Sequence, residues 1–414
     1  MTMRNKYTKD RKGKHPSWKN ELSEPPRNPV RRTGITGEDG TGSSVPVAPT
    51  RRHLLRGTLL ATIPFVQPPA RGSTSRLGLP GPYPGRVIAV RHPRSIVSNV
   101  YQAQPVEEMM RKGMMELTGA PGWVDAWRVF FEPGDVVAIK VSPVGGAGMC
   151  SDALVLNRIV DGLKQAGVRT GDIIVYNRYR REMFEAGIPR WLPDGVRLSW
   201  ASEAYNRVQH DIEGYDPETF VELALAMPGQ DIRDERVRRS YVANLLVKQV
   251  NKVVNLPVLK HHDCAGVTIA LKNLSHGFVN NVERSHARPP YLNATGTFIP
   301  AIVNNPVFRQ KVVLNIVDGI RAIWNGGPAG NREFMWEHKT MYFGTDPVAL
   351  DKTGWKVVDR KRVEKGLLPV VESRAGGPNR FSFPQVQHIE LAGILGLGEF
   401  DDARIKVKRF DLPA

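Results

Sequence analysis

Residues 136–141 read Val-Val-Ala-Ile-Lys-Val, and this short stretch decides the fold of the chain. A continuous apolar run of this length, after the turn signal Pro-Gly-Asp at 133–135, predicts a strand buried on both faces. Ser151 or Asp152 can cap a helix that runs to about residue 166. Residues 172–176, Asp-Ile-Ile-Val-Tyr, predict the next strand. A strand, a helix and a second strand in this order indicate a parallel sheet with right-handed crossovers.

The same patterns continue on both sides of this unit. Further strands are predicted at 86–90, 252–256, 311–317 and 339–343, and further helices at 106–117, 239–250, 266–274 and 346–362. The charged segment 180–235 has little periodicity and is expected to hold loops and short helices. We therefore predict an α/β fold: a mostly parallel sheet with helices on both faces, in a single large domain with irregular insertions at about residues 85–400.

Composition limits the classes of partner. Hydrophobic residues make up 41% of the chain, enough for a sizeable core, and no apolar run reaches the roughly 18–20 residues of a membrane-spanning helix. The formal net charge is +17, but residues 1–56 hold 13 of the 58 Lys and Arg against 5 of the 41 Asp and Glu. The other basic residues are scattered and form no stripe interleaved with aromatics, so no nucleic-acid partner is predicted. A basic surface favours anionic ligands or anionic surfaces.

Cysteine usage restricts the cofactors. The chain has only Cys150 and Cys264. Two thiols cannot supply a four-cysteine iron–sulfur cluster or a four-cysteine zinc site within one chain. A single disulfide between them is left open by the sequence.

The N-terminal part resembles a targeting segment. Residues 1–50 are rich in Lys, Arg, Pro, Gly and Ser, and this composition predicts a disordered basic extension. In 51–75, Arg51-Arg52 is followed by Leu54-Leu55 and a modest apolar stretch, as in a bacterial twin-arginine export signal. This predicts handling by the twin-arginine machinery and a periplasmic or extracytoplasmic location. The alternative is a basic linker before a short buried helix, and a translation start nearer the Arg pair would explain the long lead.

The densest polar cluster lies at 260–273, which reads Lys-His-His-Asp-Cys-Ala-Gly-Val-Thr-Ile-Ala-Leu-Lys-Asn. It follows an apolar run at 253–259 that is typical of a buried strand. Ionisable groups at the end of such a strand are where an open α/β fold places its chemistry. Adjacent side chains of an extended segment point to opposite faces, so only one of His261 and His262 is expected to enter a site. A polar loop with solvated histidines is the alternative.

These residues give a predicted site. The lysines would hold a carboxylate or phosphate group, and a histidine would act as a general base or as the ligand of a divalent metal. The predicted catalytic set is Lys140, Lys260, His262, Lys272, Asn273, His286 and Asp318. The predicted metal ligands are His261, His262 and His286.

Several motifs in order resemble the family called domain of unknown function 362. They are 136–140 (Val-Val-Ala-Ile-Lys), 255–262 (Asn-Leu-Pro-Val-Leu-Lys-His-His), 266–273 (Gly-Val-Thr-Ile-Ala-Leu-Lys-Asn), 284–286 (Arg-Ser-His), 316–319 (Ile-Val-Asp-Gly), 326–328 (Gly-Gly-Pro) and 346–351 (Asp-Pro-Val-Ala-Leu-Asp). The resemblance implies an α/β protein. It also implies that Arg284, Asp346 and Asp351 belong to the family pattern, although Asp346 could simply cap a helix. Some members carry ferredoxin-type iron–sulfur domains, which two cysteines cannot support here.

Three hypotheses for function follow. The first is an exported enzyme acting on a small anionic substrate, with or without a metal. The second is a non-catalytic periplasmic protein that binds a metal or an anion with the same residues. The third is a scaffold with a vestigial site, which the density of charged residues disfavours because buried charges without partners are costly.

Overall fold

The computed structural model describes residues 76–206, 209–286, 294–328, 332–372 and 386–414. The basic extension predicted at 1–50 and the export signal predicted at 51–75 lie outside these ranges and stay predictions. Within the described ranges, no helix is both long and apolar enough to span a membrane, in agreement with the sequence. Cys150 and Cys264 are buried and do not form a disulfide with each other.

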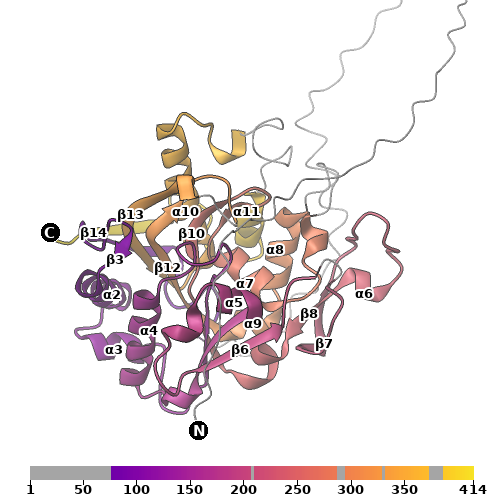
Figure 1. Cartoon of the computed structure of the whole chain (residues 1–414), viewed down its shortest axis with the longest axis horizontal. Helices are drawn as coiled ribbons and strands as arrows, with labels where there is room; N and C mark the ends of the chain where they lie inside the picture. The colour runs from indigo at the N-terminus through magenta and orange to yellow at the C-terminus, as the bar shows by residue number, and fades with distance from the viewer. Residues whose placement is uncertain (1–75, 207–208, 287–293, 329–331, 373–385) are drawn as a thin grey trace, which may run out of the picture. The chain divides into compact units, whose positions relative to one another are not determined.

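One ten-stranded sheet organises the described part of the chain (Figure 1). Its strands are β1 (Arg86–Arg91), β4 (Val137–Lys140), β5 (Ile173–Tyr179), β6 (Arg197–Ser202), β9 (Lys252–Asn255), β10 (Val258–His262), β11 (Gly266–Thr268), β12 (Val312–Ile323), β13 (Met335–Gly344) and β14 (Lys406–Asp411). The order is β14-β1-β13-β12-β9-β4-β5-β6, with β10 beside β12 and β11 beside β10. The neighbours from β12 to β6 are parallel, whereas β13 runs antiparallel to both β12 and β1.

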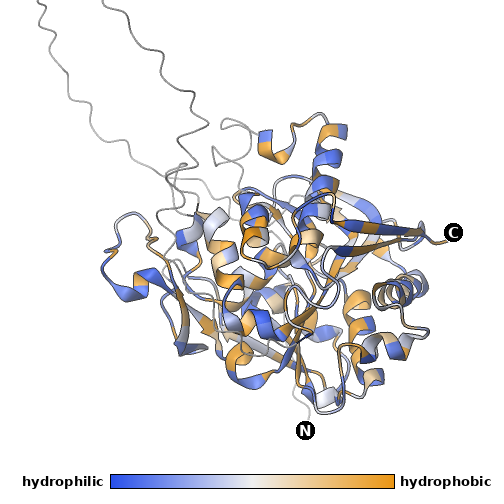
Figure 2. Ribbon diagram, turned by 180° about the vertical axis from the view of Figure 1, so that it is seen from behind, coloured by the Kyte–Doolittle hydropathy of each residue, from blue (hydrophilic) through white to orange (hydrophobic). Residues whose placement is uncertain are grey.

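Helices cover both faces of this sheet, as predicted. The helices of the described ranges are α2 (Ala103–Thr118), α3 (Trp123–Arg128), α4 (Ala153–Ala166), α5 (Arg180–Glu185), α7 (Ala270–Phe278), α8 (Thr295–Val303), α9 (Pro306–Lys311), α10 (Pro347–Glu364) and α11 (Gln387–Ile394), together with the short α6 (Glu235–Arg238), which lies in the irregular insertion instead of on this sheet. Val137 and Ile139 of β4 join one core with α2, α3 and α4, while Ala138 joins a second core with α7 to α11. The helix ribbons carry both hydrophobic and hydrophilic residues, as expected for helices that pack by one face (Figure 2).

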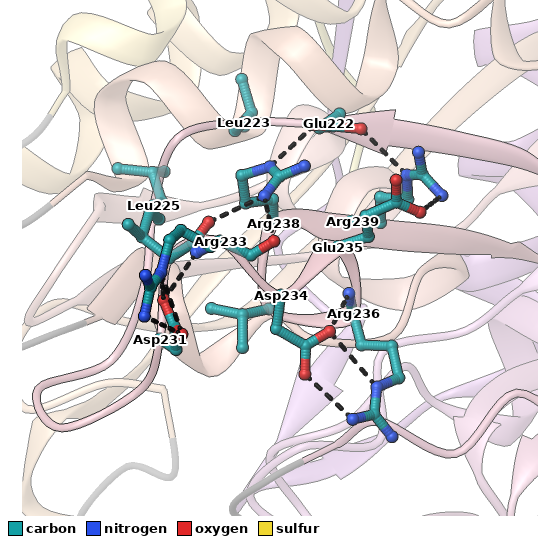
Figure 3. A network of polar contacts seen from close by, with 12 residues as sticks. Glu222, Leu223, Leu225, Asp231, Arg233, Asp234, Glu235, Arg236, Arg238 and Arg239 are labelled. Atoms are coloured by element: carbon teal, nitrogen blue, oxygen red, sulfur yellow. Dashed lines mark hydrogen bonds and ion pairs between the residues drawn. The ribbon is translucent and has the colours of Figure 1, made fainter.

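The irregular insertion contains more strand than the sequence predicted. The helix expected at 239–250 is wrong, because β8 (Arg239–Ala243) pairs with β7 (Tyr215–Glu222), and only residues 245–249 form a π-helical turn. The partner strand is about twenty residues away in sequence, so local periodicity could not reveal the pairing. Exposed ion pairs cluster here, with Glu222 accepting from both Arg238 and Arg239 (Figure 3).

Two strand ends and one helix start also differ from the sequence-based prediction. The apolar run before the polar cluster is two strands, since β9 ends at Asn255 and Lys260 to His262 lie within β10 itself. The helix expected from Gly266 begins only at Ala270, after the short β11. β12 continues past Asp318 to Ile323, with a register shift between Gly319 and Arg321. Asp318 is therefore in mid-strand instead of at a strand end.

Candidate functional site

A cavity of about 420 Å³ opens where β4, β5 and β10 meet the start of α7 and the turn Glu283–His286. It brings together six of the seven predicted catalytic residues, namely Lys140, Lys260, His262, Lys272, Asn273 and His286. The remaining lining residues are Ser142, Pro143, Val144, Asn177, Arg178, Tyr179, Glu182, Tyr205, Asp263, Cys264, Thr268, His276, Gly277, Val282, Glu283 and Pro328.

Lys140 is buried and fully hydrogen-bonded. Its Nζ donates to the carbonyl of Val141 at 2.6 Å and to the side-chain oxygens of Asn177 and Asn273 at 3.1 Å each. Burial lowers the pKa of Lys140 to about 7. A Cβ on Gly277 of α7 would lie 2.0 Å from Lys140 Cε, so the glycine makes room for this side chain. Because an ammonium has three donors, Lys140 has none left for a ligand and instead orients two amides.

Lys260 and Lys272 are different, because their ammonium groups have donors to spare. Lys260 Nζ donates only to the carbonyl of Val144, at 2.9 Å, and Lys272 Nζ has no hydrogen-bond or ion-pair partner among the described residues. Both are buried, with 1% and 7% of the residue exposed. Burial lowers the pKa of Lys260 to about 8 and that of Lys272 to about 7. Both ammonium groups line the cavity with donors to spare, so they are available to a ligand that enters it.

Sequence reasoning missed other polar groups of the cavity. Thr268 Oγ1 and Arg178 Nε are buried and make no hydrogen bond within the described part of the chain. Arg178 follows Asn177 near the end of β5, so a search of every strand end would have found it. The carboxylates of Glu182, Asp263 and Glu283 also line the cavity but are less buried than the lysines.

Hydrogen bonds fix the tautomer of His262. The backbone N–H groups of Cys264 and Ala265 donate to His262 Nδ1 at 3.0 and 3.2 Å. Burial and the neighbouring Lys272 hold the pKa of His262 well below its ordinary value, so the ring is neutral. In a neutral ring whose Nδ1 accepts, Nε2 carries the proton. His262 therefore presents an N–H donor.

Hydrogen bonds fix the opposite tautomer in His286. Ser285 Oγ donates its only proton to the carbonyl of Val282 at 2.7 Å, so it can only accept from the imidazoles around it. With the Ser285 proton on this carbonyl, His286 Nδ1 at 3.2 Å and His276 Nε2 at 3.1 Å are assigned as the donors. Burial lowers the pKa of His286 and keeps it neutral. Its Nε2 is left as a lone-pair acceptor.

One place in the cavity brings three possible metal ligands together. Donor atoms of His262, Cys264 and His286 lie within 4.8 Å of one another. The predicted ligand His261 is absent from the cavity lining, since it points to the other face of β10, and Cys264 takes its place. The fit is poor at His262, because Nδ1 accepts two backbone N–H groups and leaves Nε2 protonated. Binding a metal there would require breaking those hydrogen bonds.

Asp318 does not line the cavity. Its carboxylate accepts from the Tyr101 hydroxyl at 3.0 Å and from the backbone N–H groups of Asp152 and Ile320 at 3.1 and 3.2 Å. Burial raises the pKa of Asp318 to about 7. These contacts tie Tyr101, which precedes α2, and the start of α4 to β12, which is a structural role.

The remaining family-pattern residues also lie outside the cavity. Asp346 caps α10 by accepting from the N–H of Ala349 at 2.9 Å, as the structural alternative predicted. Asp351 of α10 accepts from the N–H groups of Ala270 and Leu271 at 2.7 and 3.1 Å, and so caps α7 from another helix. Arg284 is fully buried and donates to backbone carbonyls of the β7–β8 insertion.

Comparison with known proteins identifies the family. The model of the family described as domain of unknown function (DUF362) matches residues 137–356, more than half of the chain. The chain belongs to this family. No curated protein matches it.

Solved structures give only distant likenesses. A Thermotoga maritima protein, a target of the Northeast Structural Genomics Consortium, is 13% identical with a TM-score of 0.36. The alignment covers 66% of this chain but only 61% of that protein. A loganic acid methyltransferase with SAH is 10% identical over 71% of this chain and 70% of its own, with a TM-score of 0.23.

Proposed function

We propose that this DUF362 protein is an enzyme that acts on a small anionic molecule held in the cavity. The observation that carries this proposal is Lys272, a residue only 7% exposed that lines the cavity and whose ammonium group has no hydrogen-bond or ion-pair partner in the described ranges. Lys260 has donors to spare beside it, and Thr268 Oγ1 is also without a partner. A carboxylate or phosphate would satisfy these donors together, because ionised acceptors make the strongest hydrogen bonds to ammonium groups.

The site supports an enzyme over a passive anion receptor because imidazoles share it with the cations. A receptor needs only the charges of Lys260 and Lys272, whereas His262 and His286 add an N–H donor and a free lone pair to the same cavity. Neutral imidazole groups are suited to proton transfer near neutral pH. A cavity of about 420 Å³ limits the ligand to a small molecule.

The test is anion binding by calorimetry, with inorganic phosphate and pyruvate as probes. The Lys260→Met/Lys272→Met double variant is expected to lose binding while its circular dichroism spectrum stays native. Lys352→Met is the matched control, because Lys352 is also largely buried but lies outside this cavity. Unchanged binding in the double variant would rule the proposal out.

Turnover separates the enzyme from the receptor. Compounds that bind are followed by NMR for conversion, because both kinds of protein are stabilised by a ligand but only an enzyme consumes it. Binding without conversion of any bound compound would favour the non-catalytic binding protein.

We also propose export by the twin-arginine route, which rests on the Arg51-Arg52 pair and the apolar residues after it. The expected result is that an Arg51→Lys/Arg52→Lys variant stays in the cytoplasm of a bacterial host whereas the unaltered chain reaches the periplasm. Equal fractions of both chains in the periplasm would exclude this route.

A further inference from the structure

Two imidazoles in the cavity face each other with opposite proton positions. The rings of His262 and His286 are stacked, with centroids 5.7 Å apart and planes 28° apart. His262 comes from β10 and His286 from the turn Glu283–His286, so the pair is made by tertiary structure. The backbone N–H groups of Cys264 and Ala265 make His262 a donor at Nε2, and Ser285 makes His286 an acceptor at Nε2.

Both rings are held neutral, which this pairing requires. His262 is neutral because its Nδ1 accepts two backbone N–H groups, and the free lone pair of His286 is on the ring nitrogen that does not contact Ser285. A neutral ring N–H can stabilise an oxyanion by donating a hydrogen bond to it. A neutral ring with a free lone pair can accept a proton. The cavity thus holds a ring nitrogen with a free lone pair and a ring N–H donor beside two lysines with donors to spare.

We propose that the site moves a proton at a carbon next to a carbonyl group, which rests on the proposed function above. His286 Nε2 takes the proton as the C–H bond breaks. The electron pair of that bond forms the C=C bond of an enolate, and the carbonyl π electrons move to oxygen. His262 Nε2–H donates to this oxygen. The imidazolium of His286 then returns the proton to a carbon of the enolate, so the step needs no oxidant or reductant.

The surrounding residues define the class of substrate. Lys272 and Lys260 supply free donors for a carboxylate or phosphate, and Thr268 Oγ1 adds a further polar contact. The substrate is therefore a small molecule with one anionic group and a ketone or aldehyde carbonyl. Reactions of this class are isomerisation, racemisation or exchange of the proton with solvent.

The first test is the position of the histidine protons, measured without any substrate. The full chain has 10 histidines and is labelled with ¹⁵N in their rings. Long-range ¹⁵N–¹H spectra are expected to show a proton on Nε2 of His262 and on Nδ1 of His286, with His262→Gln and His286→Gln giving the assignments. A proton on Nδ1 of His262, or tight binding of one Zn²⁺ per chain that removes the Nε2 proton, would overturn the proposal in favour of a metal site.

The second test is exchange of carbon-bound protons in D₂O, with pyruvate as the carboxylate probe and dihydroxyacetone phosphate as the phosphate probe. We expect exchange of at least one probe, and a loss of about 10²-fold or more in His286→Gln with binding retained. His338→Gln is the control, because His338 is half-buried on β13 and lies away from the cavity.

The outcomes distinguish the two proposals. Probe binding without exchange above the buffer rate would overturn the proton-transfer step and leave the anion-binding enzyme standing. Absence of binding for both probes and for inorganic phosphate would overturn both. Exchange that survives in His286→Gln would show that another group accepts the proton, and would overturn the role of His286.

Discussion

Buried carboxylates and buried ammonium groups lie in different regions of this protein and have different surroundings. The framework aspartates, Asp318, Asp346 and Asp351, each accept at least two hydrogen bonds, mostly from backbone N–H groups at helix or strand junctions. The cavity lysines, Lys260 and Lys272, have one acceptor between them among the described residues. The number of satisfied hydrogen bonds therefore separates the buried groups that hold the fold together from the two lysines that the proposed ligand would contact.

Lys140 shows that this distinction does not follow residue type. It lies beside the cavity lysines and carries the same ammonium group, but its three donors all have acceptors. By the same criterion it belongs with the framework aspartates. Substitutions that remove one partner at a time test whether buried groups with satisfied hydrogen bonds stabilise the fold and buried groups without them do not.

The largest effect is expected from Asp351→Ala. It leaves the buried N–H groups of Ala270 and Leu271 without acceptors at the start of α7. At about 1–3 kcal/mol for each, the unfolding free energy should fall by about 2–6 kcal/mol, measured by urea denaturation. Anion binding should fall as well, because α7 carries Lys272. An Asp351→Ala variant with an unchanged unfolding free energy would contradict a framework role for Asp351.

Lys140→Met is expected to destabilise the protein by about 1–3 kcal/mol, because the acceptors of Lys140 lose their donor. Gly277→Ala should act in the same direction, since its Cβ would overlap Lys140. Urea denaturation measures both. If Lys140→Met kept full stability but lost anion binding, Lys140 would belong with the cavity lysines.

Lys272→Met is expected to weaken anion binding roughly 10- to 100-fold, the equivalent of one charged hydrogen bond. The stability of the ligand-free protein should be unchanged or higher, because an unpaired buried charge is removed. Calorimetry with inorganic phosphate and urea denaturation of the same sample give the two values. A loss of stability similar to that of Lys140→Met would contradict a ligand-binding role.

The pH dependence of the unfolding free energy should reflect the lowered pKa of Lys272. Folding lowers the pKa of Lys272 from 10.5 to about 7, so between these values the unfolded chain binds more protons than the folded one. The contribution of Lys272 to the unfolding free energy therefore rises with pH across this window. Urea denaturation at pH 7.5, 8.5 and 9.5 should show a smaller rise in Lys272→Met than in the exposed control Lys356→Met. Equal rises of the unfolding free energy in the two variants would mean that Lys272 is exposed to solvent in the folded chain.

The smallest effect is expected in the exposed network of Figure 3. Glu222→Gln weakens the ion pairs with Arg238 and Arg239, which lie at the surface of the insertion. Exposed pairs contribute about 0–1 kcal/mol, so the urea midpoint should hardly move. A loss as large as that of Asp351→Ala would mean that satisfied charges stabilise this protein regardless of burial.

The sequence predicted the unit from β4 to β5 because its signals are local. The apolar run of β4, the Asp152 cap and the left-handed Gly167 at the end of α4 all act within a few residues. Lys140, Lys260 and His262 could be predicted for a related reason, because parallel strands bring their carboxyl ends to one edge of the sheet. Lys272, Asn273 and His286 lie on α7 and the turn after it, and were predicted from the density of polar residues that follow β10. Asp318 was misplaced because β12 continues through it, held by β13 and β10 from distant parts of the chain.

The sequence by itself determined the α/β class, the family pattern and the presence of lysines and histidines at one edge of a sheet, since these depend on short-range periodicity and residue type. Only the tertiary structure decided which charges are satisfied. Lys140 meets Asn273 across 133 positions, Asp351 meets Ala270 across 81, and Ser285 sets the tautomer of His286 through the Val282 carbonyl. Hydrogen bonding depends on distances between atoms that no local pattern contains, so the roles of identical side chains emerged only from the folded chain.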